Sequence, residues 1–139
     1  MRTRWQDDRG SVAPLVLVLV AVILAMTGLA VDGARILAAR REAIDTAQSA
    51  ARAGAQAVDA NALRQGDMTL DPTGATAEAE AYLAATGHHG TVAVVDGRVE
   101  VTVTITKPMA LLSALGIAER TVTGVGTARP VRGVAQAES

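Results

Sequence analysis

The sequence predicts an α+β fold, in which a long N-terminal transmembrane and stalk helix is followed by a small three-stranded, mainly antiparallel sheet with two short helices. Residues 12–31 form an uncharged apolar run of helical length. Residues 32–60 are rich in the helix formers Ala, Arg, Glu and Gln and contain no Pro. After residue 90 the hydrophobic pattern changes to a period of two, which is typical of half-buried strands.

The composition favours one small domain beside one membrane anchor. Half of the 139 residues are apolar, but there is no Phe, one Trp and one Tyr. A core with almost no aromatic residues, reduced further by the anchor, is too thin to enclose a deep catalytic pocket. The net charge of −1 provides no basic surface for nucleic acid, and the absence of Cys excludes disulfides and Cys-based metal sites. We therefore expect no enzyme, no cofactor, no nucleic-acid partner and no small-molecule substrate.

Residues 12–31 are predicted to cross a membrane as one helix, so the lipid bilayer is the first expected partner. At about 1.5 Å per residue the run spans roughly 30 Å, the thickness of the hydrocarbon core. Arg9 precedes the run, and Asp32 and Arg35 follow it one helical turn apart. We expect Asp32 and Arg35 to form an ion pair at the membrane edge. The competing interpretation is a signal peptide cleaved near Ala30, although the apolar core of such peptides usually has only about 7–15 residues.

Residues 32–60 are predicted to continue the same helix as a stalk. Small residues recur along it at every fourth position, and such a row permits the close approach of another backbone. The row consists of Ala39, Ala43, Ala47, Ala51 and Ala55. The sequence leaves open whether this row packs against a neighbouring subunit or against the small domain of the same chain.

Residues 61–128 are predicted to form that small domain, and residues 129–139 a disordered tail. The Asp96-Gly97 pair between two alternating segments is a strong hairpin signal. Gly87 is a typical residue to end a helix. The expected elements are a loop at 61–73, a helix at 75–85, strands at 91–95 and 98–106, a short apolar helix at 108–116 and a third strand at 121–128.

The third predicted strand has one unusually small face, which includes Gly124 and Gly126. Glycine within a strand often marks a site where another backbone comes close. We hypothesise that this face receives the Ala-rich helix. The connection that precedes the strand contains a helix, so the pattern leaves open whether the second and third strands run parallel or antiparallel.

Candidate chemical groups do not assemble into a catalytic or metal site in the sequence. His88 and His89 are adjacent, so their side chains diverge, and nothing completes a tetrahedral set of ligands. Glu78 and Glu80 lie two residues apart on a predicted helix and point in different directions. We predict no catalytic, cofactor-binding or metal-binding residues.

The order of the parts is similar to that of pilin-like proteins. The segment DRGSVAPLVLVLVAVILAMTGLAVDGARILAARREAIDTAQSAARAGAQAVD resembles the TadE/TadG-like family of tight-adherence (Flp) pilus assembly proteins. In that family an Arg-Gly pair precedes the apolar helix. The C-terminal part is also similar, with a VEVTVTIT strand, a PMALLSALGI helix and a TVTGVGTAR strand.

The resemblance implies a minor pilin-like or pilus-assembly protein that crosses the plasma membrane once. It implies a short cytoplasmic leader at residues 1–11, an extracytoplasmic domain, and other pilus-assembly or pilin-like subunits as partners. The basic residues cannot orient the helix by themselves, because three Arg lie close to it on either side. In some members a prepilin peptidase cuts after a Gly, and the matching position is Gly10, which would leave Ser11 as the new N-terminus. Leu15 stands where processed pilins usually carry Glu, so cleavage and a retained leader both remain open.

Overall fold

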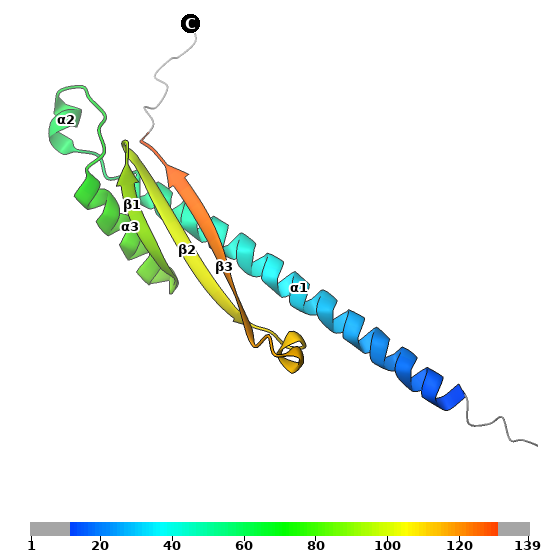
Figure 1. Ribbon diagram of the computed structural model, residues 1–139. Coiled ribbons are helices and arrows are strands. Elements are labelled where there is room, and N and C mark those ends of the chain that lie inside the picture. Colours follow the sequence, from blue (N-terminus) through cyan, green and yellow to red (C-terminus); the bar gives the residue numbers. More distant parts are fainter. Residues whose placement is uncertain (1–11, 131–139) are drawn as a thin grey trace, which may run out of the picture.

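The computed structural model describes residues 12–130 and confirms the predicted fold class (Figure 1). One long helix is followed by short helices and a three-stranded antiparallel sheet. The predicted leader at 1–11, with Gly10 and Ser11, and all but the first two residues of the predicted tail lie outside the described residues. The elements are α1 (Val12–Gly54), α2 (Ala60–Arg64), α3 (Pro72–Thr86), β1 (His89–Val95), β2 (Arg98–Pro108), the 3-10 turn η2 (Leu112–Leu115) and β3 (Glu119–Ala128).

Helix α1 is unbroken from the apolar run into the small domain. Among residues 12–31 only Gly28 is buried, and this is the one described helix long and apolar enough to cross a membrane. The helix ends at Gly54 and not at residue 60 as predicted. Gly54 lies under α3, where an added Cβ would come within 2.6 Å of the Ala75 carbonyl oxygen. The end of α1 is thus set by packing against a helix that is distant in the sequence.

The sheet has the order β1-β2-β3, and both pairs of neighbours are antiparallel, which answers the question left open by the sequence. The predicted hairpin between β1 and β2 is present. Asp96 and Gly97 have φ values of 50° and 68°, as expected for a type I′ turn, in which both central residues are left-handed. The buried face of β2 carries Val99, Val101, Val103 and Ile105.

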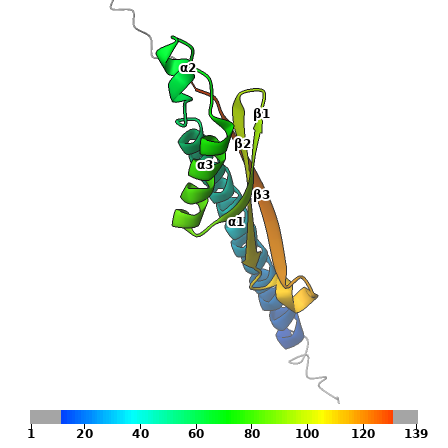
Figure 2. The same cartoon turned by 90° about the vertical axis from the view of Figure 1, so that its left-hand side faces the viewer.

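The two longer helices cover this apolar face of the sheet, so the domain has two layers (Figures 1 and 2). Helix α1 packs against β2 and β3, whereas α3 packs against α1 and β1. Much of the core therefore consists of Ala side chains on the helices and Val side chains on β2. Because Ala is small, the helices lie close to the sheet.

The close approach of the Ala-rich helix to the third strand, hypothesised from the sequence, is confirmed. The spacing of the small residues on β3 matches the spacing of those on α1. A Cβ added to Gly124 would meet the α1 backbone at Ala43 and Ile44, and one added to Gly126 would meet it at Ala47 and Gln48. Two strand residues advance by about 6.6 Å and four helix residues by about 6 Å. A row of small residues at every second position can therefore stay level with a row at every fourth position.

The connections differ from the sequence-based expectation at helix starts. Helix α3 begins three residues before the predicted start, because the Asp71 carboxylate accepts a hydrogen bond from the Thr73 N–H at 3.1 Å and Pro72 occupies the first turn. Helix α2 was not predicted and lies in the expected loop. It begins after Asp59, whose carboxylate accepts hydrogen bonds from two backbone N–H groups.

Candidate functional site

The most tightly organised polar group lies where α1 meets the connection between β2 and β3. We call residues 109–118 the β2–β3 turn. Asp32 of α1 is fully buried beneath it. One carboxylate oxygen accepts the N–H of Ala110 at 3.0 Å, and the other accepts those of Leu111 and Leu112 at 2.9 and 3.0 Å. One side chain on the long helix therefore holds the start of η2 in place.

These hydrogen bonds determine the charge state of Asp32, which lies one residue beyond the apolar run. They favour the ionised form and hold the pKa of Asp32 below its ordinary value, and nearby Arg35 acts in the same direction more weakly. The predicted pair of Asp32 and Arg35 is present, but its closest N–O distance is 4.0 Å and the Arg35 side chain is 55 % exposed. The main partner of Asp32 is therefore backbone, which the sequence did not indicate.

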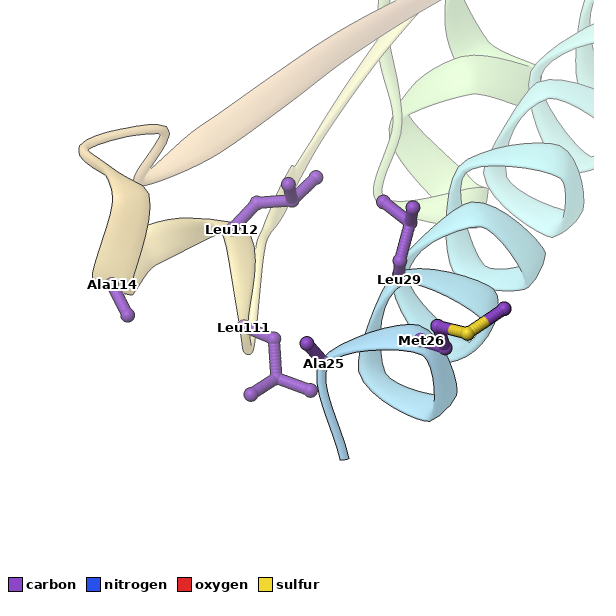
Figure 3. Close-up of a pocket in the computed structure, with 6 residues that line it drawn as sticks. All are labelled: Ala25, Met26, Leu29, Leu111, Leu112 and Ala114. Carbon is purple, nitrogen blue, oxygen red and sulfur yellow. The ribbon is translucent and has the colours of Figure 1, made fainter. Parts of the chain in front are cut away.

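Below Asp32 the β2–β3 turn lies against the apolar run itself. Leu111 packs over Gly28, where any Cβ would overlap its side chain. Beside this contact is an open groove of about 400 Å³, formed almost entirely by apolar atoms (Figure 3). Its lining comes equally from α1 and from the β2–β3 turn: Ala25, Met26, Leu29, Leu111, Leu112 and Ala114. The apolar run is thus in contact with its own extramembrane domain.

A second polar cluster lies further along α1 than Asp32 and joins α1, the segment before β1, and β2. Glu42 of α1 accepts a hydrogen bond from His88 Nε2 at 3.1 Å and lies 3.6 Å from Lys107 Nζ. The hydrogen bond to His88 lowers the pKa of Glu42, and the positive charge of Lys107 contributes to the same shift. His88 therefore links α1 to the segment before β1.

The row of small residues on α1 is used within the chain. Ala39, Ala43, Ala47, Ala51 and Ala55 are all at most 8 % exposed, because the sheet and α3 cover them. Of the two interpretations of this row, the structure shows the one in which the chain's own domain covers it. A helix from another subunit would first have to displace the domain.

The remaining candidate groups stay apart. His89, Glu78 and Glu80 are exposed, and in the described part of the chain no three His, Asp or Glu side chains are placed to share a metal ion. Sequence reasoning missed the residues that do meet, such as Gly28 with Leu111 and Glu42 with His88, because they are distant in the sequence. The one available signal was the uncharged stretch at 108–118, which resembles the apolar run in composition.

The fold and the contact between α1 and the β2–β3 turn together define a class of protein. A single helix carries an exposed apolar run at one end and supports a small α+β domain at the other. Residues 10–57 match the family model described as Putative Flp pilus-assembly TadE/G-like, in agreement with the predicted resemblance. No curated protein and no solved structure matches the chain. The match, which covers about a third of the chain, supports a relation to Flp pilus assembly.

The matched region contains only the α1 side of the contact between α1 and the β2–β3 turn. It begins at Gly10, includes the whole apolar run with Gly28 and Asp32, and ends three residues after α1. The sheet and the β2–β3 turn lie outside it.

Proposed function

We propose that this chain is a minor pilin-like or pilus-assembly protein of a tight-adherence pilus or a related secretion system. Residues 12–31 anchor it in the plasma membrane, with the N-terminus in the cytoplasm and the α+β domain outside. Its role is structural, and it acts by presenting the domain at a fixed position next to other subunits of the machinery. The single observation that carries the proposal is the division of α1 into an exposed apolar half and a half buried under the sheet.

Two further observations support an anchor that stays attached. Cleavage near Ala30 would remove Gly28 and leave the covering Leu111 without its partner on α1. The helix is also continuous through Ala30, so no extended segment is offered to a protease. A binding module secreted after such a cut is therefore the weaker alternative.

Partner contacts must use surfaces other than the Ala row. The described surface offers the outer face of the sheet, with its exposed Thr residues, and the exposed side chains of the apolar run. In lipid, helices associate by close packing and not by a hydrophobic driving force, so neighbouring subunits would have to fit the surface of the run.

The test is intact-mass measurement and N-terminal sequencing of the protein from its native cells, separated into membrane and medium. The proposal expects a membrane-bound chain. A start at Ser11 would make it a processed, fibre-type subunit, whereas a retained leader would make it a permanent assembly factor. A soluble chain that starts near Val31 would contradict the proposal. Protease added to cells without an outer barrier should remove the domain, and protection of the domain would overturn the proposed orientation.

A further inference from the structure

We propose that the β2–β3 turn is a second membrane-contacting element, which places its apolar side chains among the lipids of the bilayer that residues 12–31 cross. The inference deepens the proposed function and rests on its membrane anchor. The occupant of the groove beside Leu111 is then a lipid acyl chain.

The position of the turn along α1 is the first reason. The groove residues Ala25 and Leu29 belong to the apolar run. Gly28, which Leu111 covers, is three residues before the end of the run, and Ala25 is six residues before it. At 1.5 Å per residue the turn reaches roughly 5 to 9 Å inside that end. If the run fills the hydrocarbon core, the turn lies among the outer parts of the acyl chains, just inside the headgroups.

The composition of the turn is the second reason. From Pro108 to Ala118 the chain carries no charged residue. Leu111 and Ile117 are 47 % and 44 % exposed. Leu111 lines the same apolar groove as the exposed Met26 and Leu29 of α1. Apolar surface of this kind at the edge of a membrane span is expected to lie in lipid.

The hydrogen bonding of the turn is the third and most specific reason. Backbone polar groups in lipid must be satisfied within the protein, because no water is available. Asp32 accepts the N–H groups of Ala110 and Leu111, before η2, and of Leu112, its first residue. Carbonyl groups of the turn accept others. The latter bonds run from Met109 to Ala118, from Ala114 to Leu111, from Gly116 to Ser113 and from Ile117 to Leu112, at 2.9–3.1 Å. The Ser113 hydroxyl also donates internally, to the Ala110 carbonyl at 2.9 Å.

Charged residues return where the headgroups would lie. Lys107 and Arg120 are direct partners across β2 and β3, and Arg35 extends from α1 next to Lys107. Like charges directly opposite one another on a sheet are unfavourable in isolation. Glu42 already offsets part of the charge of Lys107, and lipid phosphates would reduce the repulsion further. Glu119 also lies in this band, and Glu42 is paired with Lys107, so the band marks a polar boundary of mixed sign.

The test uses the absence of Cys, which makes any single introduced Cys unique. Full-length Ala114→Cys and Ile117→Cys are labelled with a nitroxide in vesicles of phosphatidylcholine and phosphatidylglycerol. Collision of the label with oxygen, which enters lipid, is compared with collision with a charged nickel complex, which stays in water. Both sites are exposed, so neither change removes a core contact. Val95→Cys at the distant hairpin serves as the water reference, and Leu24→Cys as the lipid reference.

We expect the oxygen-to-nickel ratio at positions 114 and 117 to approach that at position 24 and to exceed that at position 95 by about tenfold, because a charged complex is excluded from hydrocarbon. A ratio equal to that at position 95, with position 24 in lipid, would overturn the lipid contact and leave the anchor intact. If neither reagent reached positions 114 and 117, a second copy of this chain and not lipid would cover the turn, which would overturn the lipid contact. A water-like ratio at position 24 would overturn the anchor, and the proposed function with it.

Discussion

Asp32 shows how one side chain can connect an anchor to a domain. A carboxylate just beyond an apolar run would ordinarily remain in water. Here it is buried, and its charge is stabilised by three backbone N–H groups from a segment almost eighty residues later in the sequence. Hydrogen bonds to an ionised acceptor are among the stronger ones, and an unpaired N–H at this depth would be costly. We therefore regard Asp32 as the residue that fixes the β2–β3 turn.

The first prediction concerns Asp32→Asn, which preserves the shape of the side chain but replaces one acceptor oxygen with a donor. At least one of the three N–H groups then faces an amide NH₂ and loses its bond. We expect hydrogen exchange at residues 110–112 to become about tenfold faster or more, while exchange in the β1–β2 hairpin stays unchanged. Asp45→Asn, at an exposed position of the same helix, is the matched control and should change neither region.

The same variant should alter the dependence of stability on pH. The folded pKa of Asp32 is lowered, so its contribution is complete above the ordinary aspartate pKa and is lost as the pH falls through the folded value. Wild type should therefore melt at a higher temperature than Asp32→Asn at neutral pH, and the difference should shrink in strong acid. A difference that stayed constant down to strong acid would contradict the assignment of the charge to Asp32.

At the scale of elements, the fold depends on the match between a strand and a helix. The Gly residues of β3 and the Ala residues of α1 allow two backbones to touch, which larger side chains would prevent. The contact contains few large apolar groups, so its stability comes from the close packing of the two backbones. It should therefore tolerate added volume poorly.

The second prediction is that Gly126→Val destabilises the domain by about 2–4 kcal/mol, because the new side chain would overlap the α1 backbone at Ala47. Thermal unfolding followed by circular dichroism in detergent measures the effect. Thr127→Val is the matched control, since residue 127 is exposed on the other face of the same strand, and it should change stability by about 0.5 kcal/mol or less. Equal melting temperatures for Gly126→Val and wild type would contradict the close contact.

The elements could be predicted from the sequence where the signal is local. Hairpin residues Asp96 and Gly97 and the alternation in β2 depend on neighbouring residues, and they are present as expected. The early start of α3 depends on the Asp71 side chain, a local signal that was not used. The end of α1, the antiparallel direction of β3 and the bonds of Asp32 depend on residues far along the chain. No pattern within a short window contains that information.

At the scale of the whole molecule, one helix serves as both anchor and core. Because α1 runs unbroken from residue 12 to residue 54, the domain has no hinge relative to the apolar run. The β2–β3 turn adds a brace, since it contacts α1 before Gly33, at Gly28 and Asp32, whereas β3 contacts α1 after Gly33. Any force on the domain should therefore pass directly to the membrane segment.

The last prediction tests this rigid coupling with two nitroxide labels, at Val20→Cys in the apolar run and Val95→Cys in the distal hairpin. In an otherwise unchanged chain the distribution of distances between the labels should be narrow. Gly33→Pro removes the N–H that continues the helix and places a ring against the Leu29 carbonyl, so the distribution should broaden or shift. Gly33→Ala is the control. An added Cβ there meets no atom within 4 Å, and Ala favours the helix by about 1 kcal/mol over Gly, so the narrow distribution should persist. A broad distribution with Gly33 unchanged would show that the anchor and the domain move independently, and the brace would then have no mechanical role.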